Sequence, residues 1–183
     1  MPDDTLFEIA QRRYRERYAA DIAPSYARWV AEEAAPGHGA VLGYRDAAEG
    51  PLFLETYLDS PIEAAIAEAL HRPVSRNQIV EIGSFAADNC LAMARLWASA
   101  ASRLVGSHSI AVATLTRPMR AMFARIGLPL TEIAVATADR LDGGASRWGR
   151  YYDEDPRVCV GLIADGQAAL ATFFDRGARR KVA

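Results

Sequence analysis

The stretch from Arg76 to Ala87, RNQIVEIGSFAA, has the clearest pattern of apolar and polar positions in the chain. Apolar side chains fall on both faces, as in a strand that is covered on each side: Ile79, Val80, Ile82, Phe85 and Ala86. Alternation along a strand places Glu81 on the same face as Gly83 and Phe85. The pattern therefore predicts a buried central strand with one carboxylate that points into the protein interior.

The rest of the chain divides into further strands and helices by the same kind of pattern. Strands are expected over residues 6–10, 40–45, 52–57, 109–115, 132–137 and 158–163, with 40–45 and 52–57 forming a hairpin. Helices are expected over 12–22, 24–34, 61–71, 90–104 and 117–126, and from 167 onwards. Asp88 or Asn89 is the expected cap of the helix at 90–104. Strands and helices alternate in the second half of the chain, so the predicted class is α/β with a mixed sheet.

The size and charge of the chain fit one soluble domain over residues 1–183. The 21 basic and 23 acidic residues nearly balance, so no net field points to a nucleic-acid partner. Neither the two cysteines, Cys90 and Cys159, nor the three histidines are spaced like metal ligands. Because the sequence shows no secretory signal and no membrane-length apolar run, we expect a cytoplasmic protein with no membrane span and no metal site.

Glu81 is the leading candidate for chemistry, because an ionised carboxylate without partners is disfavoured by roughly several kcal/mol in an apolar interior. It must be paired, hydrogen-bonded or held protonated by a raised pKa. Gly83 marks a strand bulge or a place where another backbone or a ligand comes close. A reaction site and a structural ion pair with an arginine are both open on this pattern.

Five segments resemble the thermostable hemolysin family in order and spacing: PLFLETYLDSPIE, RNQIVEIGSFA, ATLTRPMRAMFARIGL, WGRYY and DPRVCVGLI. More distantly, the order of elements and the pattern of Glu81, Ser84 and Phe85 are similar to the acyl-homoserine-lactone synthases, which have a GNAT-type acyltransferase fold. The resemblance implies a GNAT-like mixed, mostly antiparallel central sheet of about six to seven strands, flanked by helices in a single domain. It also implies an intracellular N-acyltransferase that moves a fatty or ketoacyl group to a small amine or amino acid, as in specialised metabolism.

Two departures from these relatives bear on the substrates. Ser84 stands where the synthases carry an arginine, so their acceptor, S-adenosylmethionine, is not carried over to this chain. The segment AADNCLAMAR has no glycine, whereas ordinary GNAT acetyltransferases hold the CoA pyrophosphate with a glycine-containing loop at this helix N-terminus. The resemblance therefore implies a phosphopantetheine thioester on acyl carrier protein as the donor, with acyl-CoA as the other choice and no tightly bound cofactor. Whether the chain acts alone or as a homodimer is open.

Glu81 is the expected general base of such a transfer, acting directly or through a water molecule. Backbone amides freed by irregularity between Gly83 and Phe85 are the expected oxyanion donors. The substrate-binding candidates are charged, small and aromatic residues: Arg45, Glu55, Arg76, Gly83, Ser84, Phe85, Trp148, Tyr151 and Tyr152. The alternative for the arginines is structural pairing with the acids, and for the aromatic residues it is a loop anchor packed on the sheet.

Two other functions compete with acyl transfer. The family name implies a membrane-acting hemolysin, which needs an amphipathic or spanning segment that the sequence does not display. A GNAT-like binding module without catalysis is the other alternative, and it would lack an ordered pocket around Glu81.

Overall fold

A computed structural model describes residues 3–23, 25–35, 38–141 and 145–182. Its centre is a six-stranded sheet in the order β1-β2-β3-β4-β6-β5. The strands are β1 (Arg28–Ala35), β2 (His38–Asp46), β3 (Ile79–Ala87), β4 (Ile110–Leu115), β5 (Thr131–Val135) and β6 (Arg157–Leu162). Strands β3 and β4 run parallel, and every other neighbouring pair is antiparallel. The predicted α/β fold with a mixed, mostly antiparallel sheet is confirmed.

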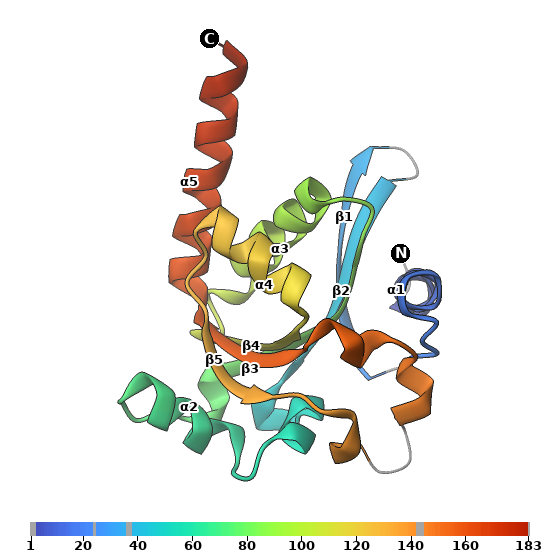
Figure 1. The fold of residues 1–183 in the computed structure, drawn as a ribbon. Helices are drawn as coiled ribbons and strands as arrows, with labels where there is room; N and C mark the ends of the chain where they lie inside the picture. Colours follow the sequence, from blue (N-terminus) through green and yellow to red (C-terminus); the bar gives the residue numbers. More distant parts are fainter. Residues whose placement is uncertain (1–2, 24, 36–37, 142–144, 183) are drawn as a thin grey trace.

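Five α-helices flank this sheet: α1 (Asp3–Tyr18), α2 (Ile62–Leu70), α3 (Cys90–Leu104), α4 (Arg117–Ile126) and α5 (Ile163–Val182). Figure 1 shows α3, α4 and α5 gathered on one side of the sheet and α2 on the other, while the last turns of α5 project away from the body. Helix α1 packs against β1, β2 and β3. The two halves of the central sheet are therefore covered by different helices.

Three sequence predictions in the first third of the chain are wrong. Residues 6–10 belong to α1, because Leu6, Ala10, Tyr14 and Tyr18 recur every fourth residue and form one buried stripe. Residues 28–34 form β1 instead of a helix, since their backbone pairs with β2 and this tertiary contact outweighs the helix preference of alanine and glutamate. Residues 53–57 form a 3-10 helix, so the hairpin partner of β2 is β1. Pro24, the expected helix start, lies outside the described residues.

The later elements follow the sequence patterns closely. The Asn89 side chain accepts a hydrogen bond from the Ala92 N–H at 2.9 Å, so Asn89 and not Asp88 is the cap of α3. Gly127 ends α4 with a φ of 85°, a left-handed conformation that suits glycine. The C-terminal helix begins at Ile163, a few residues before its predicted start. These local signals are strong because capping and turn chemistry act over only a few residues.

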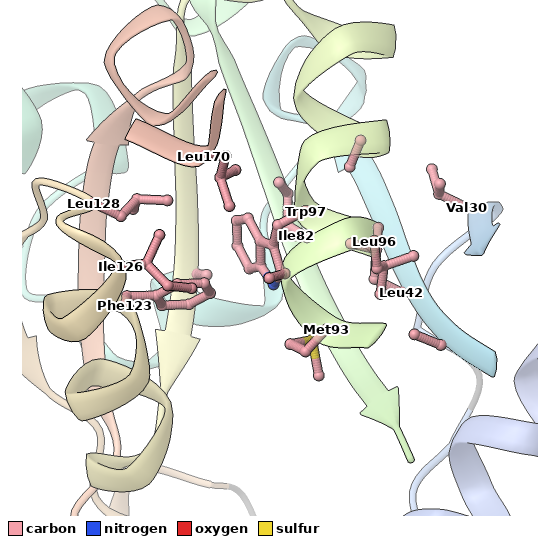
Figure 2. Packing of buried hydrophobic residues seen from close by; sticks show 14 of the residues in the cluster. Val30, Leu42, Ile82, Met93, Leu96, Trp97, Phe123, Ile126, Leu128 and Leu170 are labelled. Carbon is pink, nitrogen blue, oxygen red and sulfur yellow. The ribbon is translucent and has the colours of Figure 1, made fainter. Parts of the chain in front are cut away.

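The largest core cluster lies between the sheet and helices α3, α4 and α5. Figure 2 shows Trp97 of α3 at its centre, beside Phe123 of α4 and Ile82 of β3. The Trp97 and Phe123 ring centroids lie 4.8 Å apart in an edge-to-face arrangement. A second core on the opposite face joins α2 and the 3-10 helix at 53–57 to β3, β4 and β6. Both faces of β3 are thus covered, as its apolar pattern predicts.

Phe123→Ala is expected to lower the free energy of unfolding by about 3–5 kcal/mol, because this fully buried ring leaves a cavity that α4 cannot close. The matched control is Leu91→Ala on α3, which is 46% exposed and is expected to change stability by no more than about 0.5 kcal/mol. Urea unfolding followed by circular dichroism measures both. Equal losses in the two variants would contradict the placement of this core.

Candidate active site

The candidate site lies at the point where the central sheet opens. Strands β3 and β4 pair over a short stretch whose last pair joins Glu81 to Val112. Beyond it, β3 continues to Ala87 alongside β2, and β4 continues to Leu115 alongside β6. The two halves of the sheet therefore diverge beyond Glu81, and this residue lies at the base of the fork.

A bulge in β3 follows directly after the fork. From the pair Gly43–Gly83 to the pair Val41–Ala86, β3 advances by one residue more than β2 does. Ser84 takes up the extra residue with a φ of 49°, in the left-handed region. Phe85 consequently packs on Trp97, on the opposite face from Glu81. The irregularity expected here is confirmed, and the prediction that Phe85 shares a face with Glu81 is wrong because the bulge reverses the alternation.

The Glu81 carboxylate is held by two consecutive backbone donors, although the residue is only 1% exposed. Its Oε2 accepts a hydrogen bond from the Phe53 N–H at 2.9 Å, and its Oε1 accepts one from the Leu54 N–H at 3.0 Å. Arg45 on the neighbouring strand places its Nε 3.5 Å from Oε2. Burial raises the pKa of Glu81 above its ordinary value, against the opposing effect of these donors. This carboxylate therefore takes up a proton at a higher pH than an exposed glutamate does.

Tyr26 contacts the same carboxylate, and no sequence pattern indicated it. Its hydroxyl hydrogen-bonds to Glu81, and its ring lies against Gly43 and Gly83, a facing pair on β2 and β3. A methyl group at Gly83 would overlap the hydroxyl, and one at Gly43 would come within 2.6 Å of the Tyr26 Cβ. Burial and the nearby Glu81 charge raise the pKa of Tyr26 well above its ordinary value. The Tyr26 hydroxyl is therefore neutral, and the two glycines leave room for it beside the carboxylate.

Arg76 and Glu55 lie away from the fork and brace the loop that holds Glu81. Arg76 donates from Nη1 and Nη2 to the two Glu55 oxygens, at 2.7 Å each. Glu55 in turn accepts hydrogen bonds from the Leu52 N–H at 2.8 Å and the Ile62 N–H at 3.0 Å. The hydrogen bond from Arg76 is the main cause that lowers the pKa of Glu55 to about 2. This network fixes the backbone on both sides of the two amides that grip Glu81.

A cleft of about 620 Å³ opens between the diverging strands. Its walls come from α1, from the end of β3 with the start of α3, and from the end of β4 with the start of α4. The inner wall carries Phe85, Met93, Met119 and Met122, and the α1 side carries Arg13, Tyr14, Arg17 and Tyr18. One side of the cleft is therefore apolar, while the other carries hydroxyl and guanidinium groups.

A smaller cavity of about 30 Å³ adjoins the cleft next to Gly83 and Tyr26. Tyr14, Phe85, Thr114 and Tyr151 line both spaces. The remaining wall of the small cavity includes three further aromatic side chains besides Tyr26: Phe53, Tyr57 and Trp148. It has room for a small polar group such as a water molecule or an amine.

Apart from Glu55 and Arg76, the predicted substrate-binding residues divide into three groups around the fork. Gly83, Ser84, Phe85, Trp148 and Tyr151 line the cleft or the small cavity. Arg45 adjoins Glu81, while its guanidinium also donates to the Ser25 and Pro51 carbonyls and lies over the Tyr26 ring. Tyr152 lies further out, where its hydroxyl is 2.7 Å from that of Tyr57.

Sequence reasoning missed several residues of the site, namely Tyr26, the α1 side chains and the methionines of the inner wall. The four-residue spacing of Tyr14 and Tyr18 was a usable signal, and their rings do meet at 5.5 Å. Tyr26 gave no such signal, because the glycines that admit it belong to strands distant in the sequence.

The sequence matches the family model described as thermostable hemolysin over residues 4–167. The chain belongs to the thermostable hemolysin family. None of the curated proteins matches this chain in sequence.

Several solved structures share the fold of this chain at low sequence identity. TofI in an apo form has a TM-score of 0.60 at 19% identity, over 93% of this chain and 91% of its own. BjaI, a CoA-dependent acyl-homoserine lactone synthase solved with SAM and isopentyl-CoA, has a TM-score of 0.55 at 16% identity, over 96% and 82%. FeeM, an N-acyl amino acid synthase from uncultured soil microbes, has a TM-score of 0.53 at 15% identity, over 92% and 95%.

Two further properties of the chain concern membranes and metals. Among the described residues, no helix combines the length and the apolar character needed to cross a membrane. Within the same part of the chain, the acidic, histidine and cysteine side chains form no group of three or more that could hold a metal ion. The chemistry offered at the fork is that of a buried carboxylate beside a hydroxyl that lines the small cavity, next to a cleft with one apolar side.

The pKa of Glu81 predicts a pH dependence of stability. Because the folded-state pKa is raised, the folded protein keeps this proton over a range where the unfolded chain has lost it, so the free energy of unfolding falls as pH rises through that range. Glu81→Gln is expected to remove this fall, which amounts to about 1.4 kcal/mol for each pKa unit of the shift. Urea unfolding of both proteins between about pH 4 and pH 8 measures it.

Glu55→Gln supplies a control of opposite sign. The depressed pKa of Glu55 stabilises the fold above the ordinary glutamate pKa, and this contribution is lost as pH falls toward about 2. The Glu55→Gln variant should therefore differ from the native protein near neutral pH and converge with it in acid. If the free energy of unfolding has the same pH dependence in the native protein and in Glu81→Gln, burial does not raise the pKa of Glu81.

Proposed function

We propose that this protein is an N-acyltransferase that moves a fatty or ketoacyl group from a pantetheine thioester to a small amine or amino acid. The observation that carries the proposal is the buried Glu81–Tyr26 pair at the base of a fork that opens into a half-apolar cleft. The fold shared with BjaI and FeeM supports the reaction class, since both are described as synthases that form acyl products.

The donor occupies the cleft between β3 and β4 in this proposal. A parting of parallel strands leaves backbone N–H and C=O groups without ladder partners, and a pantetheine arm carries amides that pair with such groups. The inner wall of Phe85, Met93, Met119 and Met122 suits an acyl chain, because methionine side chains adapt to apolar ligands. The bulge at Ser84 turns backbone amides away from the β2 ladder, and these amides serve as oxyanion donors.

The acceptor amine reaches Glu81 through Tyr26. Glu81 itself lines neither the cleft nor the small cavity, whereas Tyr26 lines the small cavity and hydrogen-bonds to Glu81. The hydroxyl accepts a proton from the amine while it passes its own proton to the carboxylate. The aromatic side chains of Tyr57, Trp148 and Tyr151 suit an acceptor that carries an aromatic or cationic group besides its neutral reacting amine.

The reaction then balances with no further reactant. The amine nitrogen attacks the thioester carbonyl, a C–N bond forms and the C–S bond breaks. The amine proton moves through Tyr26 to Glu81 and from there to solvent, and the pantetheine thiolate takes up a proton from water in the cleft. The products are an N-acyl amine and the free pantetheine thiol.

A carrier-bound pantetheine fits the start of α3 better than CoA does. The Asn89 side chain already accepts the hydrogen bond of the Ala92 N–H at the start of α3. The neighbouring Asp88 carboxylate accepts a hydrogen bond from the Gly39 N–H at 2.7 Å. A CoA pyrophosphate at this helix terminus would displace the Asn89 side chain and would face the negatively charged Asp88 carboxylate. A carrier protein keeps its single phosphodiester outside the cleft, so acyl carrier protein is the proposed partner.

Glu81→Gln is expected to lower kcat/KM by about 10²–10⁴, because the transfer loses its proton acceptor. Tyr26→Phe should lower kcat/KM as well while leaving donor binding intact, and exposed Glu68→Gln should be neutral. Carrier proteins loaded with acyl groups of several lengths are incubated with the standard amino acids and simple amines, and products are read by mass spectrometry. Transfer that survives Glu81→Gln in a folded protein would refute the assigned base, and no transfer from any donor would refute the proposed function.

The choice of donor predicts a preference of at least about tenfold in kcat/KM for an acyl carrier thioester over the matching acyl-CoA. Asn89→Gly is expected to narrow this preference, because it frees the start of α3 at a cost of only a few tenths of a kcal/mol in helix stability. Competition between the two donors in one mixture measures it. Equal use of both donors by the native protein would refute the carrier assignment.

A further inference from the structure

A base as deeply buried as Glu81 must return its proton to solvent after each turnover of the proposed reaction. The carboxylate is 1% exposed and lines neither the cleft nor the small cavity. Its contacts with the Phe53 and Leu54 N–H groups and with the Arg45 guanidinium offer no proton acceptor, because these groups only donate. The Tyr26 hydroxyl, which bonds to Glu81 and lines the small cavity, is therefore the way out for the proton.

Two further tyrosines lead from the small cavity toward solvent. Tyr57 lines the cavity and is 3% exposed, and its hydroxyl oxygen lies 2.7 Å from that of Tyr152. This separation is that of a well-formed O–H···O hydrogen bond. Tyr152 is half-buried and does not line the cavity, so its hydroxyl is the outer member of the pair.

The electrostatics of the pair suit the passage of a proton from the inner to the outer hydroxyl. Burial raises the pKa of Tyr57 far above its ordinary value, and the hydrogen bond with Tyr152 and the nearby Glu81 charge raise it further. Burial also raises the pKa of Tyr152, against the opposing effect of its hydrogen bond with Tyr57. These opposite effects are expected when Tyr57 donates and Tyr152 accepts. Both hydroxyls therefore stay neutral and keep a hydrogen that can be passed on.

We propose that Tyr57 and Tyr152 form a proton relay that carries the Glu81 proton from the small cavity to solvent. The inference rests on the proposed function, since it concerns the recovery of the proposed base. Glu81 returns its proton to the Tyr26 oxygen, while Tyr26 passes its own hydrogen to a water molecule in the cavity, which has room for one. That water protonates the Tyr57 oxygen, Tyr57 gives its hydrogen to Tyr152, and Tyr152 releases its hydrogen to solvent. Each hydroxyl gains one O–H bond and loses one, so the only net change is the loss of a proton from Glu81.

Two other hydroxyls that line the cavity bond to carbonyl groups instead. Ser25 donates to the Ala23 carbonyl at 3.2 Å, and Tyr151 donates to the Thr114 carbonyl at 3.4 Å. A carbonyl carries no hydrogen to pass on. Among the described residues that line the cavity, Tyr57 is therefore the one whose hydroxyl bonds to a second hydroxyl outside it. This exit also stays available when a donor fills the cleft, because neither member of the pair lines the cleft.

The test follows the rate at which Glu81 loses its proton after a jump from acid to neutral pH, with no substrate present. Infrared absorption of the protonated carboxyl reports this rate, and its band is identified by its absence in Glu81→Gln. Tyr152→Phe and Tyr57→Phe are each expected to slow the loss at least about tenfold, with little further slowing when they are combined. Tyr44→Phe removes a hydroxyl from β2 outside the relay and should keep the native rate. A native rate in Tyr152→Phe overturns the inference.

Tyr152→Ala separates a relay from a packing role. Removal of the ring leaves space for water beside the Tyr57 hydroxyl, so a relay should run faster in Tyr152→Ala than in Tyr152→Phe. A ring that only packs predicts the reverse order, since alanine loses more contacts than phenylalanine does. The reverse order therefore overturns the inference.

The native protein alone supplies a further measurement, should these variants fail to fold. In mixtures of light and heavy water, a relay that moves several protons together gives a curved dependence of the rate on the deuterium fraction. A straight line shows that one proton moves and overturns the relay. Neither measurement needs acyl transfer, so a protein that shows the relay but acylates no acceptor would refute the proposed function alone.

Discussion

Two backbone amides hold one buried carboxylate, and the candidate site of this protein is arranged around that contact. Phe53 and Leu54 donate to the two oxygens of Glu81 at 2.9 and 3.0 Å. Without those donors, a carboxylate that is 1% exposed would carry an uncompensated desolvation cost. The Arg76–Glu55 ion pair matters for the same reason, because it fixes the loop that presents the amides. Residues remote from the fork thus determine the state of the group at its base.

The opening of the sheet places this carboxylate at the base of the candidate site. Parallel pairing between β3 and β4 stops at Glu81, and the bulge at Ser84 prevents β3 from continuing as a regular strand. The bulge also sends Phe85 to the face of Trp97, so that one strand supplies both the buried carboxylate and part of the apolar wall of the cleft. The facing glycines Gly43 and Gly83 then give Tyr26 room to reach the carboxylate.

The elements that sequence patterns predicted correctly are those with local causes. Helices α3 and α4 have capping residues and regular apolar stripes, and β3, β4 and β6 have continuous apolar runs. The failures have nonlocal causes. Strand β1 has a helix-prone composition and becomes a strand only through its pairing with β2. Residues 52–57 were expected to form a strand, yet the Leu52 amide is committed to Glu55 and the Phe53 and Leu54 amides to Glu81, so these amides cannot join a ladder.

The sequence by itself determined that a carboxylate is buried in the central strand and that the strand is irregular just beyond it, because both follow from side-chain polarity and from glycine within a single segment. It could not determine the partners of that carboxylate. Tyr26, Phe53 and Leu54 reach Glu81 only after distant strands pair and a loop folds back over them. Nor could it give the side of the sheet on which Phe85 lies, since one extra residue in a bulge reverses strand alternation and that residue is defined only by the register with β2.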